Sequence, residues 1–199
     1  MKSGKRRLAA ALMFATAVAF PVGVVNATTT NINATSEFMG AIMLSGADME
    51  FSDVVFSSPP TVAGDFVKVG TNGAATYGGV FSAGAGASTV AGDVTITSGI
   101  DGEVIEVRCD ATATMVNGAA SVQVVGIEVE AEDVTVAYGA GSPCNGVGGA
   151  VATTLTLDLG TLDSFKFGGM VDGSTAVNWA AGNYSTVGGD DVQVDVVYQ

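Results

Sequence analysis

The side chains that perform most enzyme chemistry are scarce in this chain of 199 residues. It has no histidine and only two cysteines, Cys109 and Cys144, whereas Asp and Glu together number 20. Nucleophilic and general acid–base catalysis usually need a His, a free Cys, an activated Lys or a pair of carboxylates. The inventory leaves carboxylate chemistry as the main catalytic route and favours a protein that is not an enzyme.

The best-spaced carboxylates are those of Glu128, Glu130 and Glu132. Two carboxylates facing one sugar ring would suit glycoside hydrolysis. These glutamates alternate with Ile127 and Val129, however, and alternate residues of a strand point to opposite faces of the sheet. The pattern therefore predicts a solvent-facing acidic stripe rather than a catalytic pair.

Acidic turns offer a second kind of chemistry, the binding of calcium. Asp101-Gly102-Glu103, Asp172-Gly173-Ser174 and Asp190-Asp191 bring carboxylate oxygens together in short polar segments. Calcium prefers such ligands, but none of these segments has the EF-hand spacing, and Asp and Gly are ordinary residues of tight turns. We predict turn structure at these positions, with no metal site and no cofactor.

Two aromatic residues near the C-terminus, Trp179 and Tyr184, are candidates for a platform that stacks against a sugar ring. A Trp next to small residues just before a strand is more typical of a side chain that fills the edge of a core. An extracellular carbohydrate- or calcium-binding module therefore remains the alternative to a structural role.

The N-terminus has the pattern of a secretory signal peptide. Four cations precede residue 8, an apolar run follows to Val25, and small residues suit cleavage after Ala27. Pro21 and Gly23 interrupt the run, which favours cleavage over a membrane anchor. We expect export to the periplasm, the cell surface or the medium, with residues 28–199 forming a single domain and no membrane span after cleavage.

Export determines how the cysteines and the charge are interpreted. In an oxidising compartment a lone pair of cysteines, Cys109 and Cys144, predicts one disulfide. Loss of residues 1–27 leaves three cations against twenty carboxylates, a net charge of −17. A chain of this charge repels nucleic acid, so nucleic acid is not an expected partner.

Period-two alternation of apolar and polar residues dominates the chain after residue 27, and no capped helical stripe appears. Glycine-rich residues 78–91 and 139–149 are predicted to be loops. The pattern predicts an all-β fold, an antiparallel β-sandwich of immunoglobulin-like or jelly-roll-like type, with a closed barrel as the alternative. The segments expected to form strands are residues 49–56, 66–69, 75–81, 94–97, 104–109, 121–130, 134–136, 155–159, 165–167 and 192–198.

The opening segment of the exported chain, residues 28–44, also alternates, which predicts a long half-buried strand. It would be either the first strand of its own sandwich or a strand added to the sheet of a neighbouring subunit. The apolar residues that share one parity, and that would make the strand-exchange contacts, are Ile32, Ala34, Phe38, Ile42 and Leu44.

Short motifs at both ends of the exported chain resemble a bacterial secreted family, domain of unknown function 4402. They are Ile42-Met43-Leu44 with Asp48-Met49-Glu50-Phe51 at the start, then Gly168-Gly169-Met170, Ala181-Gly182-Asn183-Tyr184 and Val196-Val197-Tyr198-Gln199. The resemblance implies a pilin-like β-sandwich without enzymatic activity. The cysteine pair departs from the family pattern.

Together these patterns predict a non-enzymatic, exported structural or adhesive surface protein, such as a fimbria-like subunit. Its expected partners are further copies of itself or other components of a surface assembly.

Overall fold

The fold described here is that of a computed structural model, which describes residues 41–131, 136–160 and 163–199. Residues 41–199 belong to one compact unit, and the predicted signal peptide lies outside the described residues. The described residues contain strands and no helix, so no helix among them could span a membrane. The all-β prediction is confirmed.

The described part of the unit contains fourteen strands, and most are short because glycine and polar turns interrupt the chain. They are β1 (Met43–Ala47), β2 (Val54–Phe56), β3 (Phe66–Val69), β4 (Ala75–Gly78), β5 (Phe81–Ala83), β6 (Gly92–Ser98), β7 (Val104–Cys109), β8 (Thr112–Asn117), β9 (Ala120–Ala131), β10 (Ser142–Pro143), β11 (Thr153–Thr156), β12 (Ser164–Val177), β13 (Ser185–Asp190) and β14 (Val194–Tyr198).

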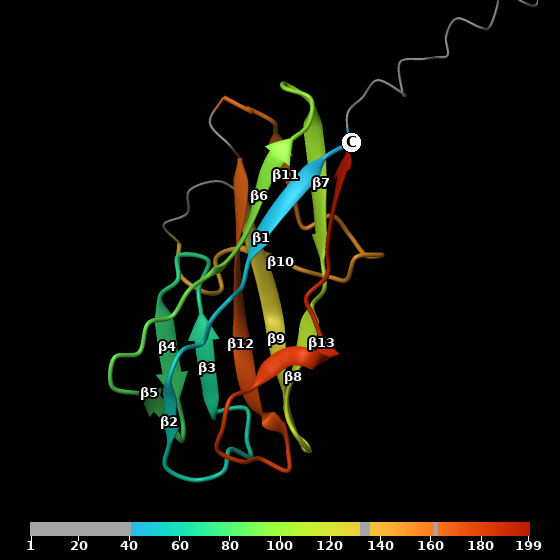
Figure 1. The fold of residues 1–199 in the computed structure, drawn as a ribbon. Coiled ribbons are helices and arrows are strands. Elements are labelled where there is room, and N and C mark those ends of the chain that lie inside the picture. Colours follow the sequence, from blue (N-terminus) through green and yellow to red (C-terminus); the bar gives the residue numbers. More distant parts are fainter. Residues whose placement is uncertain (1–40, 132–135, 161–162) are drawn as a thin grey trace, which may run out of the picture. The chain divides into compact units, whose positions relative to one another are not determined.

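The strands form three antiparallel sheets. The largest follows the order β1-β6-β12-β9-β8-β13, with β3 beside β12, β4 beside β3 and β10 beside β9. A second sheet has the order β11-β7-β14, and β2 pairs with β5. Figure 1 shows β2 to β5 gathered at one end of the unit and β7 with β11 at the other. The antiparallel, multi-sheet architecture agrees with a sandwich-like fold.

The core lies between β7 of the second sheet and β9 and β12 of the first. Ile105, Val107 and Phe165 are completely buried. In β9 the buried residues are even-numbered at first, Val122 and Val124, and odd-numbered later, Ile127 and Val129. The change occurs at Gly126, which adopts a positive φ of 57° where the pairing with β12 shifts register. This bulge lets one long strand contribute to the core along its whole length.

The predicted disulfide between Cys109 and Cys144 is present, and it joins the two main sheets. Cys109 ends β7, and Cys144 follows β10, which pairs with β9. The Cys144 N–H also donates to the Ile127 carbonyl at 2.9 Å. Both cysteines are buried, so the bond forms part of the core.

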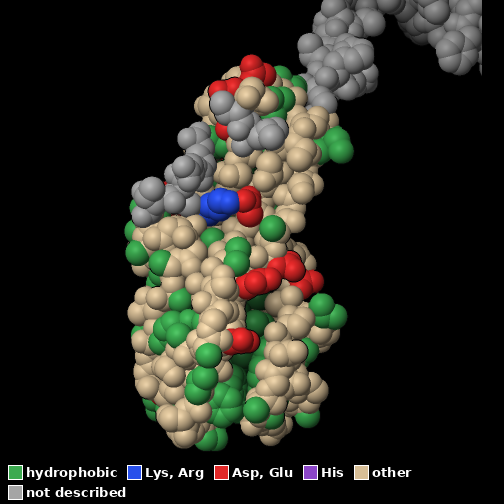
Figure 2. Space-filling view, turned by 60° about the vertical axis from the view of Figure 1, so that its left-hand side comes forward, with side chains coloured by type: hydrophobic (Ala, Val, Ile, Leu, Met, Phe, Trp, Pro, Cys, Tyr) green, Lys and Arg blue, Asp and Glu red, His purple; other side chains and the backbone are tan. Residues whose placement is uncertain are grey.

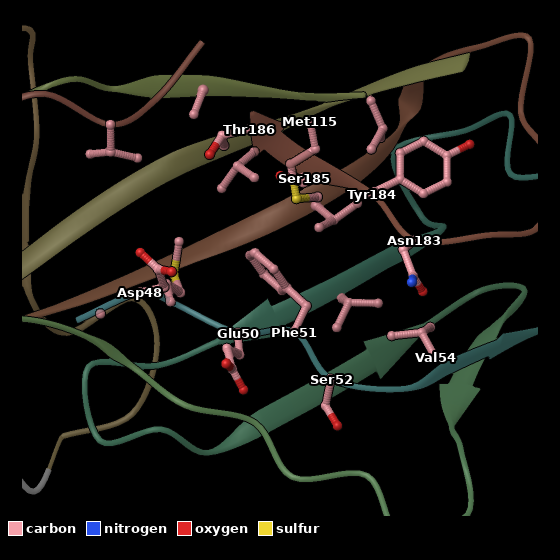
Figure 3. A pocket seen from close by; sticks show the side chains of 18 of the residues that line it. Asp48, Glu50, Phe51, Ser52, Val54, Met115, Asn183, Tyr184, Ser185 and Thr186 are labelled. Carbon is pink, nitrogen blue, oxygen red and sulfur yellow. The ribbon is translucent and has the colours of Figure 1, made fainter. Parts of the chain in front are cut away.

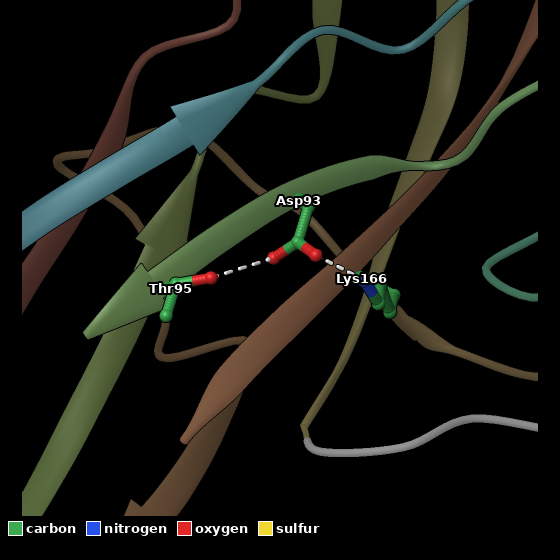
Figure 4. A network of polar contacts seen from close by, with 3 residues as sticks. All are labelled: Asp93, Thr95 and Lys166. Atoms are coloured by element: carbon green, nitrogen blue, oxygen red, sulfur yellow. Dashed lines mark hydrogen bonds and ion pairs between the residues drawn. The ribbon is translucent and has the colours of Figure 1, made fainter. Parts of the chain in front are cut away.

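One ion pair lies on the large sheet, where β6 meets β12. Lys166 bonds to Asp93, and the Thr95 hydroxyl donates to the other oxygen of Asp93 at 3.3 Å (Figure 4). The pair is partly exposed, so its contribution to stability is small. The pair does, however, engage Lys166, which is one of the few cations in the chain.

Several strand and loop predictions need correction, among them the predicted loop 139–149, which contains the two-residue strand β10. Residues 49–56 form a strand only from Val54 onward, because Ser52 has a positive φ of 61° that breaks the extended chain. The predicted loop 78–91 contains β5, which pairs with β2. Val136 lies outside any strand, and residues 134–135 of that predicted strand lie outside the described residues.

Loss of the disulfide should destabilise the fold strongly. The bond closes a separation of 35 residues, so a Cys109→Ala/Cys144→Ala variant should lose about 4 kcal/mol of unfolding free energy through the greater entropy of its unfolded chain. Urea unfolding followed by Trp fluorescence measures this difference. Wild-type protein under reducing conditions is the control and should match the variant, whereas an unchanged midpoint would contradict the structural role of the bond.

Candidate functional site

A cleft of about 990 Å³ opens at the end of the unit that contains β2 to β5. In Figure 2 apolar side chains are visible within the hollow, with acidic side chains beside it. Its floor is formed by residues of the core itself, namely Val67, Phe81, Val122, Val124, Ile127, Phe167 and Val171.

Two stretches of chain form the walls of the cleft. One is the segment between β1 and β2, residues 47–54, and the other comprises residues 179–187 with 191–194. Figure 3 shows Glu50 and Phe51 across the pocket from Tyr184 and Ser185. The floor residues are nearly inaccessible to solvent because half-buried wall side chains, among them Met49 and Phe51, pack against the core.

The segment before β2 is extended but belongs to no regular strand. Glu50 forms an isolated bridge with Val90, donating and accepting one backbone hydrogen bond at 2.9 and 3.0 Å. The segment ends at Ser52, whose hydroxyl accepts a hydrogen bond from the Ser88 N–H at 2.6 Å. Within the described part of the chain, residues 49–51 therefore form backbone hydrogen bonds on one side only, the side that faces Val90.

The opposite edge of this segment carries unpaired backbone groups. Successive residues of an extended chain direct their N–H and C=O groups to opposite sides, so those of Met49 and Phe51 point away from Val90. Among the described residues no partner accepts from or donates to these groups. Met49 and Phe51 both line the cleft, as do Gly92, Asp93 and Val94 of β6, so the segment that carries the unpaired edge forms part of the cleft wall.

Aromatic packing closes one end of the cleft. The Trp179 ring makes edge contacts with Phe56 at 5.4 Å and Phe81 at 5.6 Å, measured between ring centroids. Its face stacks on Tyr184 at 4.8 Å. These contacts agree with the prediction that Trp179 fills the edge of the core, because three neighbouring rings pack against its indole.

The predicted strand-exchange residues are only partly covered by the structure. Ile32, Ala34 and Phe38 lie outside the described residues, so their role stays a prediction. Ile42 is half-buried and packs against the core. Leu44 lies in β1 and is 42% exposed. All five β1 residues are exposed, so the expected half-buried strand is wrong for this portion.

The acidic stripe predicted on β9 is also wrong at Glu128, which is only 5% exposed. The loop that follows residue 136 covers this face of β9, and the Gly139 N–H donates to both Glu128 oxygens at 2.7 Å. Burial raises the pKa of the Glu128 carboxyl above its ordinary value, although bonds from Gly139 and Gly141 oppose the shift. Glu130 is half-buried, and Glu132 lies outside the described residues.

Two of the acidic turns have a carboxylate that accepts a backbone hydrogen bond, within its own turn at Asp172 and from a distant segment at Asp101. Asp172 accepts from the Ser174 N–H at 2.9 Å, and Asp101 accepts from the Leu159 N–H at 3.2 Å. No group of three or more acidic or sulfur side chains placed to hold a metal ion occurs among the described residues. The turn interpretation accounts for Asp172, whereas Asp101 ties its turn to the segment that follows β11.

Sequence reasoning identified the residues of the cleft as strands and turns but missed the cleft itself. The one signal was the alternation of Asp48-Met49-Glu50-Phe51, which puts apolar and acidic side chains on opposite faces. A comparison of the chain with protein-family models, curated proteins and solved structures finds no match.

The buried Glu128 carboxyl should make stability depend on pH. Because its folded-state pKa is raised, the folded protein binds the proton more tightly than the unfolded chain, and the group's unfavourable contribution grows as the pH rises through about 4.5. A Glu128→Gln variant lacks this ionisation and should gain stability relative to wild type as the pH rises from 4 towards 7. Lys68, Glu130 and Tyr138 also face this group.

Urea unfolding of both proteins across this pH range measures the difference. The matched control is Glu103→Gln, which removes an exposed glutamate and should shift the pH profile much less. A stability difference between Glu128→Gln and wild type that stays constant with pH would contradict the raised pKa.

Proposed function

We propose that this protein is a non-enzymatic, exported structural or adhesive surface protein, a fimbria-like subunit that joins its neighbours by β-strand pairing. The observation that carries the proposal is the cleft, where an apolar floor lies beside an unpaired backbone edge at Met49 and Phe51. Strand addition requires both features, because backbone bonds supply affinity and pockets for alternate side chains supply specificity.

The edge would be a liability in a protein that had no partner for it. Unpaired N–H and C=O groups beside apolar side chains invite pairing with another chain, and monomeric proteins usually cover or charge such edges. An entering strand would complete the hydrogen bonding of the wall and pack every second side chain against the half-buried wall side chains that cover the floor. In this proposal the incoming strand is added to the sandwich of its neighbour.

The buried carboxylates support a structural role as well. Asp65 accepts from the Thr61 N–H at 2.9 Å and from the Val80 N–H at 3.1 Å, and Asp163 accepts from the Asp158 N–H at 2.5 Å. These acceptors satisfy turns that connect strands. Each buried carboxylate thereby stabilises a loop conformation rather than facing an open cavity.

The strand donor that we propose is the N-terminal segment of a second copy, residues 28–40, whose apolar parity consists of Ile32, Ala34 and Phe38. A segment of this length spans roughly 40 Å when extended. The resemblance to domain of unknown function 4402 at both chain ends agrees with this role, because it implies a pilin-like sandwich.

Two variants test the assembly in a complementary way. Deletion of residues 28–40 removes the proposed donor but keeps the cleft, whereas Phe51→Asp keeps the donor and places a charge on the cleft wall. Each variant alone should be monomeric by size-exclusion chromatography with light scattering, because each lacks one half of the pairing. An equimolar mixture should form heterodimers that grow no further.

The controls are thermal unfolding of both variants and a chain in which a Gly-Ser segment of equal length replaces residues 28–40, which should also stay monomeric. Assembly of both variants to the same extent as wild type would contradict strand exchange through this cleft.

A further inference from the structure

The rim of the cleft is strongly acidic. Asp48, Glu50 and Asp53 lie on one wall, and Asp191 lies on the other. All four are exposed, and none forms an ion pair or a side-chain hydrogen bond with a described residue. Four free carboxylates thus surround an opening whose floor is apolar.

No Lys or Arg among the described residues lines this cleft. The cations that the structure describes are engaged elsewhere. Arg108 pairs with Glu106 at 2.6 Å and Lys166 pairs with Asp93, while the Lys68 ammonium lies over the Phe66 and Tyr138 rings. The negative charge at the rim is therefore left for an external partner to neutralise.

The charge is arranged with the period of a strand. Along one wall Met49 and Phe51 pack against the core, and Asp48 and Glu50, which alternate with them, are exposed. A strand paired to this edge would set its own side chains in the same two rows. Its inward side chains would meet the apolar side chains that cover the floor, and its outward ones would lie beside carboxylates, where opposite charges stabilise cross-strand pairs.

A second copy of this chain does not supply the complementary charge. Its residues 28–40 contain one charged side chain, Glu37, and the whole exported chain carries a net charge of −17. Like charges slow association and oppose pairing, whereas complementary charges steer a partner to its site. Apolar burial can seat a copy in the cleft, but the rim favours a different occupant.

We infer that the cleft also serves a basic partner, an exported protein that inserts an extended segment alternating apolar residues with Lys or Arg. This inference rests on the proposed function, because it requires the cleft to accept a strand. It adds the chemistry of the partner, in which apolar side chains fill the cleft and cations lie along the rim near Asp48, Glu50, Asp53 and Asp191. Such a partner competes with residues 28–40 of a second copy.

Binding of matched peptides to the full exported chain tests the inference. Three fluorescent peptides of equal length alternate Val with Lys, with Ser or with Glu, and fluorescence anisotropy gives their affinities. At low ionic strength the Lys peptide should bind about tenfold more tightly than the Ser peptide, and the Glu peptide should bind most weakly. Added salt should reduce these differences, because the rim charges are exposed.

Two variants locate the effect. Asp48→Asn/Glu50→Gln removes two rim charges without changing side-chain shape and should reduce the preference for the Lys peptide by about threefold or more. The matched control Glu103→Gln/Asp195→Asn removes two charges that do not line the cleft, and its preference should remain close to wild type.

The outcomes separate the inference from the proposed function. Equal binding of the Lys and Ser peptides, or an equal loss in both double variants, would overturn the basic partner while leaving strand insertion intact. Failure of every peptide to bind, including one with the sequence of residues 28–40, would count against the proposed function itself.

Discussion

The central constraint on this fold is that one core must be covered by sheets that do not extend over all of it. Where β7, β11 and β14 oppose the large sheet, Ile105, Val107 and Cys109 fill the interior completely. At the other end the covering layer consists of irregular segments, and the cleft lies over core residues that only half-buried wall side chains cover. Hydrophobic burial is the main favourable term in folding, so an unfilled part of a core is a natural place for another chain to bind.

The disulfide and the cleft are related through β9. Cys144 fastens the chain beside β10 to β7, and so fixes the second sheet over one half of β9. The other half, before Gly126, faces the cleft through Val122 and Val124. The change of buried parity at Gly126 allows one strand to serve both regions. The same strand thus has one half beneath the disulfide-linked second sheet and the other half beneath the cleft.

Alternation was sufficient to predict the fold class, because the strands that bury one face show it plainly, as in Phe165 and Phe167 of β12. The disulfide was predicted from the cysteine count and the expected export to an oxidising compartment. Glu128 was mispredicted because period-two reasoning assumes that one face of a strand meets water, whereas a loop with its own glycine donor covers this face. The cleft depends on which segments fail to pair, notably at Ser52, and such long-range absences leave no local pattern.

The central claim is that the edge at Met49 and Phe51 is free in the isolated protein and pairs with an incoming strand. Hydrogen exchange of these two amides, compared between monomer and assembled protein, tests it most directly. The account predicts fast exchange in the monomer and strong protection after assembly, with the Glu50 amide, already bonded to Val90, changing much less. Equal protection of Met49 and Phe51 in both states would contradict it.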